Sequence, residues 1–154
     1  MSKRSDAVEF VRRWRGILAK VPASQNNEQQ DTQKFWNDLL ENVLGVPGTT
    51  LPSYVDYERR VRGRRIDVFI EDHHFLCEQK SVGIDLDKPE VRQRHLETPL
   101  QQAVWYAQNL PYSVRPRWVM TCNSILAVAY QGILLNIWRT LSRRLFGRRG
   151  WMTG

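Results

Sequence analysis

Two carboxylates and a lysine occur close together in two neighbouring apolar segments of the chain. The segments RRIDVFI (64–70) and FLCEQK (75–80) flank a polar four-residue turn and have the composition of a β-hairpin. A register that pairs Ile70 with Phe75 places Asp67 opposite Glu78 and Arg65 opposite Lys80, with Ile66 and Val68 together on the other face. Opposed residues project to the same side with Cβ atoms about 5 Å apart, and side chains repeat every two residues. The pattern therefore predicts that Asp67, Glu78 and Lys80 share one face.

Two opposed carboxylates destabilise a sheet unless a cation lies between them. Mg²⁺ accepts carboxylate oxygens and keeps water molecules that can act as nucleophiles. Lys80 can orient such a water or offset charge in a transition state, and the backbone carbonyl of Gln79 can add a ligand. This pattern favours metal-dependent phosphodiester hydrolysis. The same residues also allow a simpler arrangement, in which Asp67 and Glu78 form ion pairs on a solvated sheet face with Arg64, Arg65 or Lys80.

The composition is that of a soluble globular protein with a strongly positive net charge. The chain has 154 residues, with 42% hydrophobic and 25% charged residues, so we expect one main domain with a core. The net charge of +7 favours a polyanionic partner such as nucleic acid, double-stranded DNA included, although a basic but inert surface would also explain it. A basic loop is expected to contact the phosphates, unless it is only a charged strand edge. Its members are Arg59, Arg60, Arg62, Arg64 and Arg65.

Nothing in the sequence predicts export or a membrane span. The N-terminus is charged and lacks the apolar core of a signal peptide. The apolar residues 125–138 fall short of a span and are interrupted by polar residues. Cys77 and Cys122 have no metal-binding spacing, so we expect reduced core thiols in a cytoplasmic protein without a membrane segment.

The hydrophobic periodicity predicts three helices and one further strand around the hairpin. Thr98, Pro99 and Gln101 form a capping box with proline at the first helical position, which opens a helix ending near residue 109. The other expected elements are a helix over 6–21, a helix over 31–44 capped by Asp31, a loop over 46–57 with a short edge strand near 54–57, a polar loop over 81–97 and a strand over 117–122. The fold class is therefore α/β.

Four strings of the chain resemble one nuclease family. They are TQKFWNDLLENVLG, RIDVFI, EQKSVGIDLDKPE and NLPYSVRPRWVMTCN. Together they are similar to the N-terminal nuclease domain of MmeI-like type IIG/IIL restriction-modification enzymes, which belong to the PD-(D/E)XK superfamily. The resemblance covers residues 8–123. It implies a restriction-endonuclease-like core, with a mixed β-sheet flanked by helices, that cleaves DNA with Mg²⁺.

The resemblance also implies roles for individual residues. Asp67 and Glu78 would bind Mg²⁺, and Lys80 would assist the attacking water. Gln102 and Tyr106, one helical turn apart, match the Q-x-x-x-Y element of many relatives, although the polar boundary of a helix would also explain them. An acidic residue of the first core helix is implied as well, and the candidates are Asp31 and Glu41.

The sequence departs from the family at two places. Ile66 replaces the proline of the signature, and the resemblance is expected to end after Asn123. We therefore expect a nuclease-like domain over 1–123 and an atypical basic tail over 124–154, which a frameshifted or prematurely ended gene would explain. No methyltransferase motif occurs, so the methyltransferase and target-recognition domains of the family are expected to be absent from this chain. The alternative to an endonuclease is a truncated, inactive DNA-binding remnant.

Overall fold

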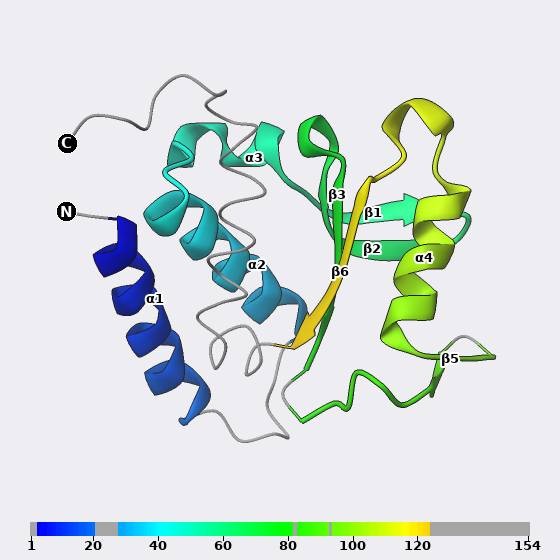
Figure 1. Cartoon of the computed structure of the whole chain (residues 1–154), viewed down its shortest axis with the longest axis horizontal. Coiled ribbons are helices and arrows are strands. Elements are labelled where there is room, and N and C mark those ends of the chain that lie inside the picture. Colours follow the sequence, from blue (N-terminus) through cyan, green and yellow to red (C-terminus); the bar gives the residue numbers. More distant parts are fainter. Residues whose placement is uncertain (1–2, 21–27, 82, 93, 124–154) are drawn as a thin grey trace.

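A four-stranded mixed sheet forms the centre of the protein (Figure 1). The computed structural model describes residues 3–20, 28–81, 83–92 and 94–123. The strands are β1 (Asp56–Val61), β2 (Arg64–Ile70), β3 (Phe75–Lys80) and β6 (Trp118–Asn123), in the order β1-β2-β3-β6. The first three strands are antiparallel, and β6 runs parallel to β3. The expected hairpin and the expected final strand are thereby confirmed.

Two helices cover one face of this sheet, with α2 lying between α1 and the strands (Figure 1). They are α1 (Lys3–Leu18) and α2 (Glu28–Asp38), and α2 continues into a π-helical turn, Leu39–Val43. Their apolar stripes bury aromatic rings in edge-to-face contact, such as Phe10 against Phe35 at 5.2 Å between centroids. From the sheet, Val68, Ile70 and Cys77 complete this larger core.

The opposite face is covered by α4 (Pro99–Asn109). The hydroxyl of Thr98 accepts a hydrogen bond from the N–H of Gln101, and the Gln101 side chain accepts one from the N–H of Thr98. The predicted capping box is thus confirmed, with Pro99 at the first helical position. The smaller core beneath α4 contains Val61, Ile66, Phe69, Leu76, Ala103, Tyr106 and Leu110.

Three expectations about the remaining elements were wrong. Asp31 lies inside α2 and is not its cap, because the helix begins at Glu28. The residues after the short helix α3 (Leu51–Tyr54) form the six-residue strand β1 where mostly loop was expected. The segment expected to be a polar loop contains a small hairpin, β4 (Glu90–Arg92) and β5 (His95–Glu97).

None of the helices described above combines the length and the apolar composition that a membrane span requires. The expected basic tail over 124–154 lies outside the described residues.

Candidate active site

The sheet opens at Asp67. The pairs Ile70–Phe75 and Phe69–Leu76 confirm the predicted register, but the β2–β3 ladder ends at Val68–Cys77, so the expected pair of Asp67 with Glu78 does not form. On its other side, β2 pairs with β1 on both sides of the position opposite Asp67 but not at that position. Glu58 occupies it with a φ of 59°, a left-handed conformation that few residues adopt. Both ladders are therefore interrupted where Asp67 lies.

The interruption has two consequences for the expected strand faces. Arg65 pairs with Arg60 of β1, and no pair forms between Arg65 and Lys80. Ile66 was expected to share a face with Val68, but it packs in the smaller core beneath α4. The strict alternation of side chains fails between these two residues because the strand is irregular at Asp67.

The Asp67 carboxylate bridges the open strands. Its Oδ2 atom accepts a hydrogen bond from the backbone N–H of Gln79 at 2.8 Å. The Gln79 side chain points the other way, because its Oε1 accepts hydrogen bonds from Trp36 Nε1 at 3.3 Å and Cys122 Sγ at 2.8 Å. Any metal ligand from Gln79 would therefore come from its backbone.

Glu78 is a buried carboxylate without enough positive charge around it. Its side chain is 3% exposed, and its Oε1 accepts a hydrogen bond from Lys80 Nζ at 2.7 Å. The other oxygen, Oε2, is buried and has no hydrogen-bond partner. Burial and the neighbouring Asp67 carboxylate raise the pKa of Glu78 to about 8, although Lys80 acts in the opposite direction.

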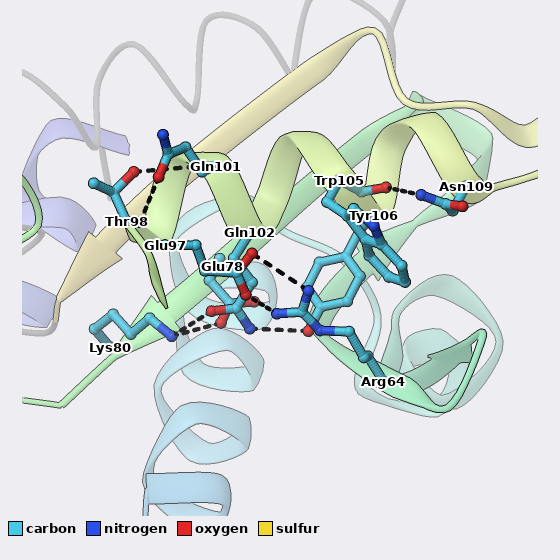
Figure 2. A network of polar contacts seen from close by, with 10 residues as sticks. All are labelled: Arg64, Glu78, Lys80, Glu97, Thr98, Gln101, Gln102, Trp105, Tyr106 and Asn109. Atoms are coloured by element: carbon cyan, nitrogen blue, oxygen red, sulfur yellow. Dashed lines mark hydrogen bonds and ion pairs between the residues drawn. The ribbon is translucent and has the colours of Figure 1, made fainter. Parts of the chain in front are cut away.

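Lys80 is held from the side of α4 (Figure 2). Its ammonium group also donates to Gln102 Oε1 at 3.0 Å, and Gln102 Nε2 donates to the hydroxyl of Tyr106 at 2.9 Å. Burial and the Glu78 carboxylate raise the pKa of Tyr106 to about 12, so its hydroxyl stays protonated at neutral pH. The structure therefore brings Glu78, Lys80, Gln102 and Tyr106 into one hydrogen-bonded row.

The arginines expected to bind phosphates occupy different environments. Arg64 is buried and forms an ion pair with Glu97, so it does not belong to an exposed basic loop. Arg59 lies on β1 and forms an ion pair with Glu71 at 2.7 Å. The three that remain exposed are on β1, β2 and the turn between them, namely Arg60, Arg62 and Arg65.

The comparisons with known proteins identify the family. The family model described as the N-terminal domain of MmeI matches residues 5–135. The chain belongs to this family. The match continues beyond residue 123, where the resemblance was expected to end. No curated protein and no solved structure matches the chain.

The two candidates for an additional acidic ligand in this member of the MmeI N-terminal domain family differ in position. Asp31 is half-buried in the first half of α2, one helical turn before the buried residue Phe35. Glu41 is exposed on the π-helical turn at the other end of α2, where its carboxylate lies against Gly48. Trp36 of α2 contacts Gln79 of β3. Trp36 lies five residues from each candidate, so this contact places neither one nearer to Gln79.

Asp67 and Glu78 of this MmeI N-terminal domain are neighbouring carboxyl groups of the type that binds a magnesium ion. Among the described residues, no group of three or more histidine, cysteine, aspartate or glutamate side chains could hold a metal. Mg²⁺ is commonly bound through one or two carboxylates and keeps several waters. The buried, unpartnered Oε2 of Glu78 beside Asp67 is a donor of this kind. Asp67 and Glu78 would hold such an ion, with the Gln79 carbonyl as a third protein ligand.

Glu97 and Trp105 both contact Arg64, and neither was expected to belong to the site. Glu97 directly precedes the Thr98 cap, and that adjacency is the only local signal for it. Cys77 and Cys122 are buried free thiols, as expected, with their sulfur atoms 3.5 Å apart.

Proposed function

We propose that this chain is a Mg²⁺-dependent DNA endonuclease domain of a restriction-modification enzyme, which hydrolyses phosphodiester bonds with a metal-activated water. The observation that carries the proposal is the state of Glu78. Burial beside the Asp67 carboxyl, with one oxygen unpartnered, raises the pKa of Glu78 to about 8, so ionising this group without a bound cation is costly. Membership of the MmeI N-terminal domain family supports a DNA-acting role.

The site residues have separate tasks in this proposal. Asp67, Glu78 and the Gln79 carbonyl would hold Mg²⁺, which when bound lowers the pKa of a water and neutralises phosphate charge. Lys80 restrains Glu78 through its hydrogen bond at 2.7 Å and places a positive charge where negative charge develops on the phosphate. Gln102 orients the Lys80 ammonium group, because its carbonyl accepts from Nζ while its amide donates to Tyr106.

The DNA backbone is proposed to lie along the exposed arginines. Arg60 and Arg62 are exposed, and Arg65 is exposed with only a long contact of 3.5 Å to Glu58. These side chains are available to phosphates without breaking a close ion pair, whereas Arg59 would first have to leave Glu71. Together with the net charge of +7, they favour a polyanionic substrate.

A plasmid-cleavage assay tests this function. Supercoiled plasmid is incubated with Mg²⁺ and the wild-type chain, Asp67→Ala or Lys80→Ala, with a chelator control. Arg13→Met serves as a matched variant, because it removes an ion pair with Asp38 on the far side of α2. We expect metal-dependent cutting by the wild type and Arg13→Met, and its loss in the two site variants.

Two outcomes would contradict the proposal in different ways. Equal cutting by all variants would show that the site has been assigned to the wrong residues. Salt-sensitive DNA binding by the wild type without any cutting would identify the chain as an inactive DNA-binding remnant.

A further inference from the structure

Arg64 is a buried arginine whose charge is used inside the protein. Its side chain is 8% exposed and forms an ion pair with Glu97, which follows 33 residues later at the end of β5. A buried arginine is tolerated only when it is paired and its donors are satisfied. Its guanidinium group is therefore committed to an internal partner.

Two aromatic rings complete the environment of Arg64 (Figure 2). The guanidinium carbon lies 4.8 Å from the ring centroid of Trp105 and 5.3 Å from that of Tyr106. A planar guanidinium stacks on aromatic faces and forms a fork of hydrogen bonds with a carboxylate, which lysine cannot reproduce. Arg64 of β2 thus joins Glu97 of β5 to two consecutive residues of α4.

Tyr106 connects this cluster to the lysine of the candidate active site. Its hydroxyl accepts from Gln102, and the carbonyl of the same amide accepts from Lys80. With its nitrogen directed at the Tyr106 hydroxyl, the amide presents its oxygen to Lys80, so the Tyr106 hydroxyl favours this orientation of the amide over the flipped one. The position of the Tyr106 ring therefore determines how Lys80 is held beside Glu78.

We propose that Arg64 is a positioning residue: clamped by Glu97 and stacked on Trp105 and Tyr106, it fixes the Tyr106–Gln102–Lys80 row that holds the lysine beside Glu78. Its effect on DNA cleavage rests on the proposed function. Its effect on the burial of Lys80 does not, so the two can fail separately.

Chemical labelling of lysines tests the positioning directly. The protein is treated briefly with an amine-acylating reagent, and mass spectrometry compares Lys80, whose side chain is 3% exposed, with Lys88, which is 78% exposed. We expect labelling of Lys80 relative to Lys88 to rise several-fold in Arg64→Met and in Glu97→Gln. It should remain at the wild-type level in Arg13→Met, which also loses an ion pair but has no connection to Lys80.

Two variants keep this test decisive. Glu97→Gln preserves the size of the side chain, so it carries the test if Arg64→Met does not fold by circular dichroism. Unchanged labelling of Lys80 in a folded Arg64→Met or Glu97→Gln protein would overturn the proposal. A rise of the same size in Arg13→Met would also overturn it, since that result would reflect general loosening.

Kinetics separate positioning from contact with DNA. If the wild type cuts, Arg64→Met should lower the turnover number about 100-fold, because small displacements of a reacting group cost that much. Its KM and the salt dependence of DNA binding should not change, whereas loss of a phosphate contact would reduce the salt slope by about 1.

The double variant Arg64→Met/Gln102→Ala should be no slower than the slower single variant, because both residues act through the same hydrogen-bonded row. Additive losses or a reduced salt slope would contradict positioning. If the wild type does not cut, the proposed function fails and labelling alone decides this inference.

Discussion

The Asp67 carboxylate accepts a hydrogen bond from the backbone N–H of Gln79 at the point where the β2–β3 ladder ends. The side chain therefore takes the place of a missing strand–strand hydrogen bond and keeps the separated strands linked. It also places a negative charge near Glu78, which raises the pKa of that carboxyl. The position of Asp67 therefore accounts both for the end of the β2–β3 ladder and for the second carboxyl group beside Glu78.

Replacing Asp67 by asparagine should separate its structural contribution from its proposed metal binding. An asparagine carbonyl can still accept from the Gln79 N–H, and the change removes a negative charge beside Glu78. We expect Asp67→Asn to keep or raise the melting temperature of the metal-free protein, while plasmid cleavage falls by about 100-fold or more. Asp67→Ala removes the hydrogen-bond acceptor as well as the charge, so both its melting temperature and its plasmid cleavage should fall. Equal destabilisation by the two substitutions would contradict this division of roles.

The metal-free protein should become less stable as pH rises. The pKa of Glu78 is about 8 in the folded protein, compared with an ordinary 4.5, so the folded state binds more protons between these values. Its unfolding free energy therefore decreases as pH increases through this window. Thermal unfolding in chelator should show a smaller decrease for Glu78→Gln than for the wild type. Mg²⁺ at pH about 8 should restore the wild type but not the variant. If the stability of both proteins decreases equally as pH rises, Glu78 is not the source of the pH dependence.

The exposed arginines should contribute to DNA affinity through phosphate contacts. Arg60→Ala and Arg62→Ala are each expected to reduce the slope of log K against log salt by about 1. Arg12→Ala is the matched control, because Arg12 is an exposed arginine of α1 with a side chain that is 74% exposed. Fluorescence anisotropy with a labelled duplex at several salt concentrations gives these slopes. If the wild type and the three variants all have the same slope, neither Arg60 nor Arg62 contacts a phosphate.

Loss of the α4 cap should affect stability more than chemistry. Thr98→Ala removes the acceptor for the Gln101 N–H, which should lower the unfolding free energy by about 1 kcal/mol. Thr98→Ser keeps the hydroxyl and should change the unfolding free energy much less. Denaturant titrations of the two variants give the comparison. Indistinguishable midpoints would show that the hydrogen bond adds nothing to the stability of the helix.

Local signals account for the parts of the fold that were predicted correctly. The apolar composition of β2 and β3 and the short turn between them were enough to place Ile70 opposite Phe75. The cap of α4 was predicted because a threonine, a proline and a glutamine at fixed spacing have one simple interpretation. Both features depend on residues that are close in the sequence.

The errors concern interactions between distant residues. β1 was underestimated because its sequence, DYERRV, has few apolar residues and gains its stability from pairing with β2. Arg64 resembled its exposed neighbours, and only the folded chain brings Glu97 and Trp105 against it. The opening at Asp67 depends on Glu58, whose left-handed backbone has no clear sequence signal.

In the turn that joins β2 to β3, a change in length by one residue has a different effect on the strand faces from a change by two. Residues 71–74 end with His74 in a left-handed conformation, and its carbonyl accepts from the N–H groups of Arg117 and Trp118. Inserting or deleting one residue there would slip β3 by one position and turn Glu78 and Lys80 toward the α1–α2 core, in exchange for Cys77 and Gln79. A change of two residues would restore the faces but separate Glu78 from Asp67. The composition of this turn is therefore freer to vary than its length, and an odd change in length should abolish the site even where the chain still folds.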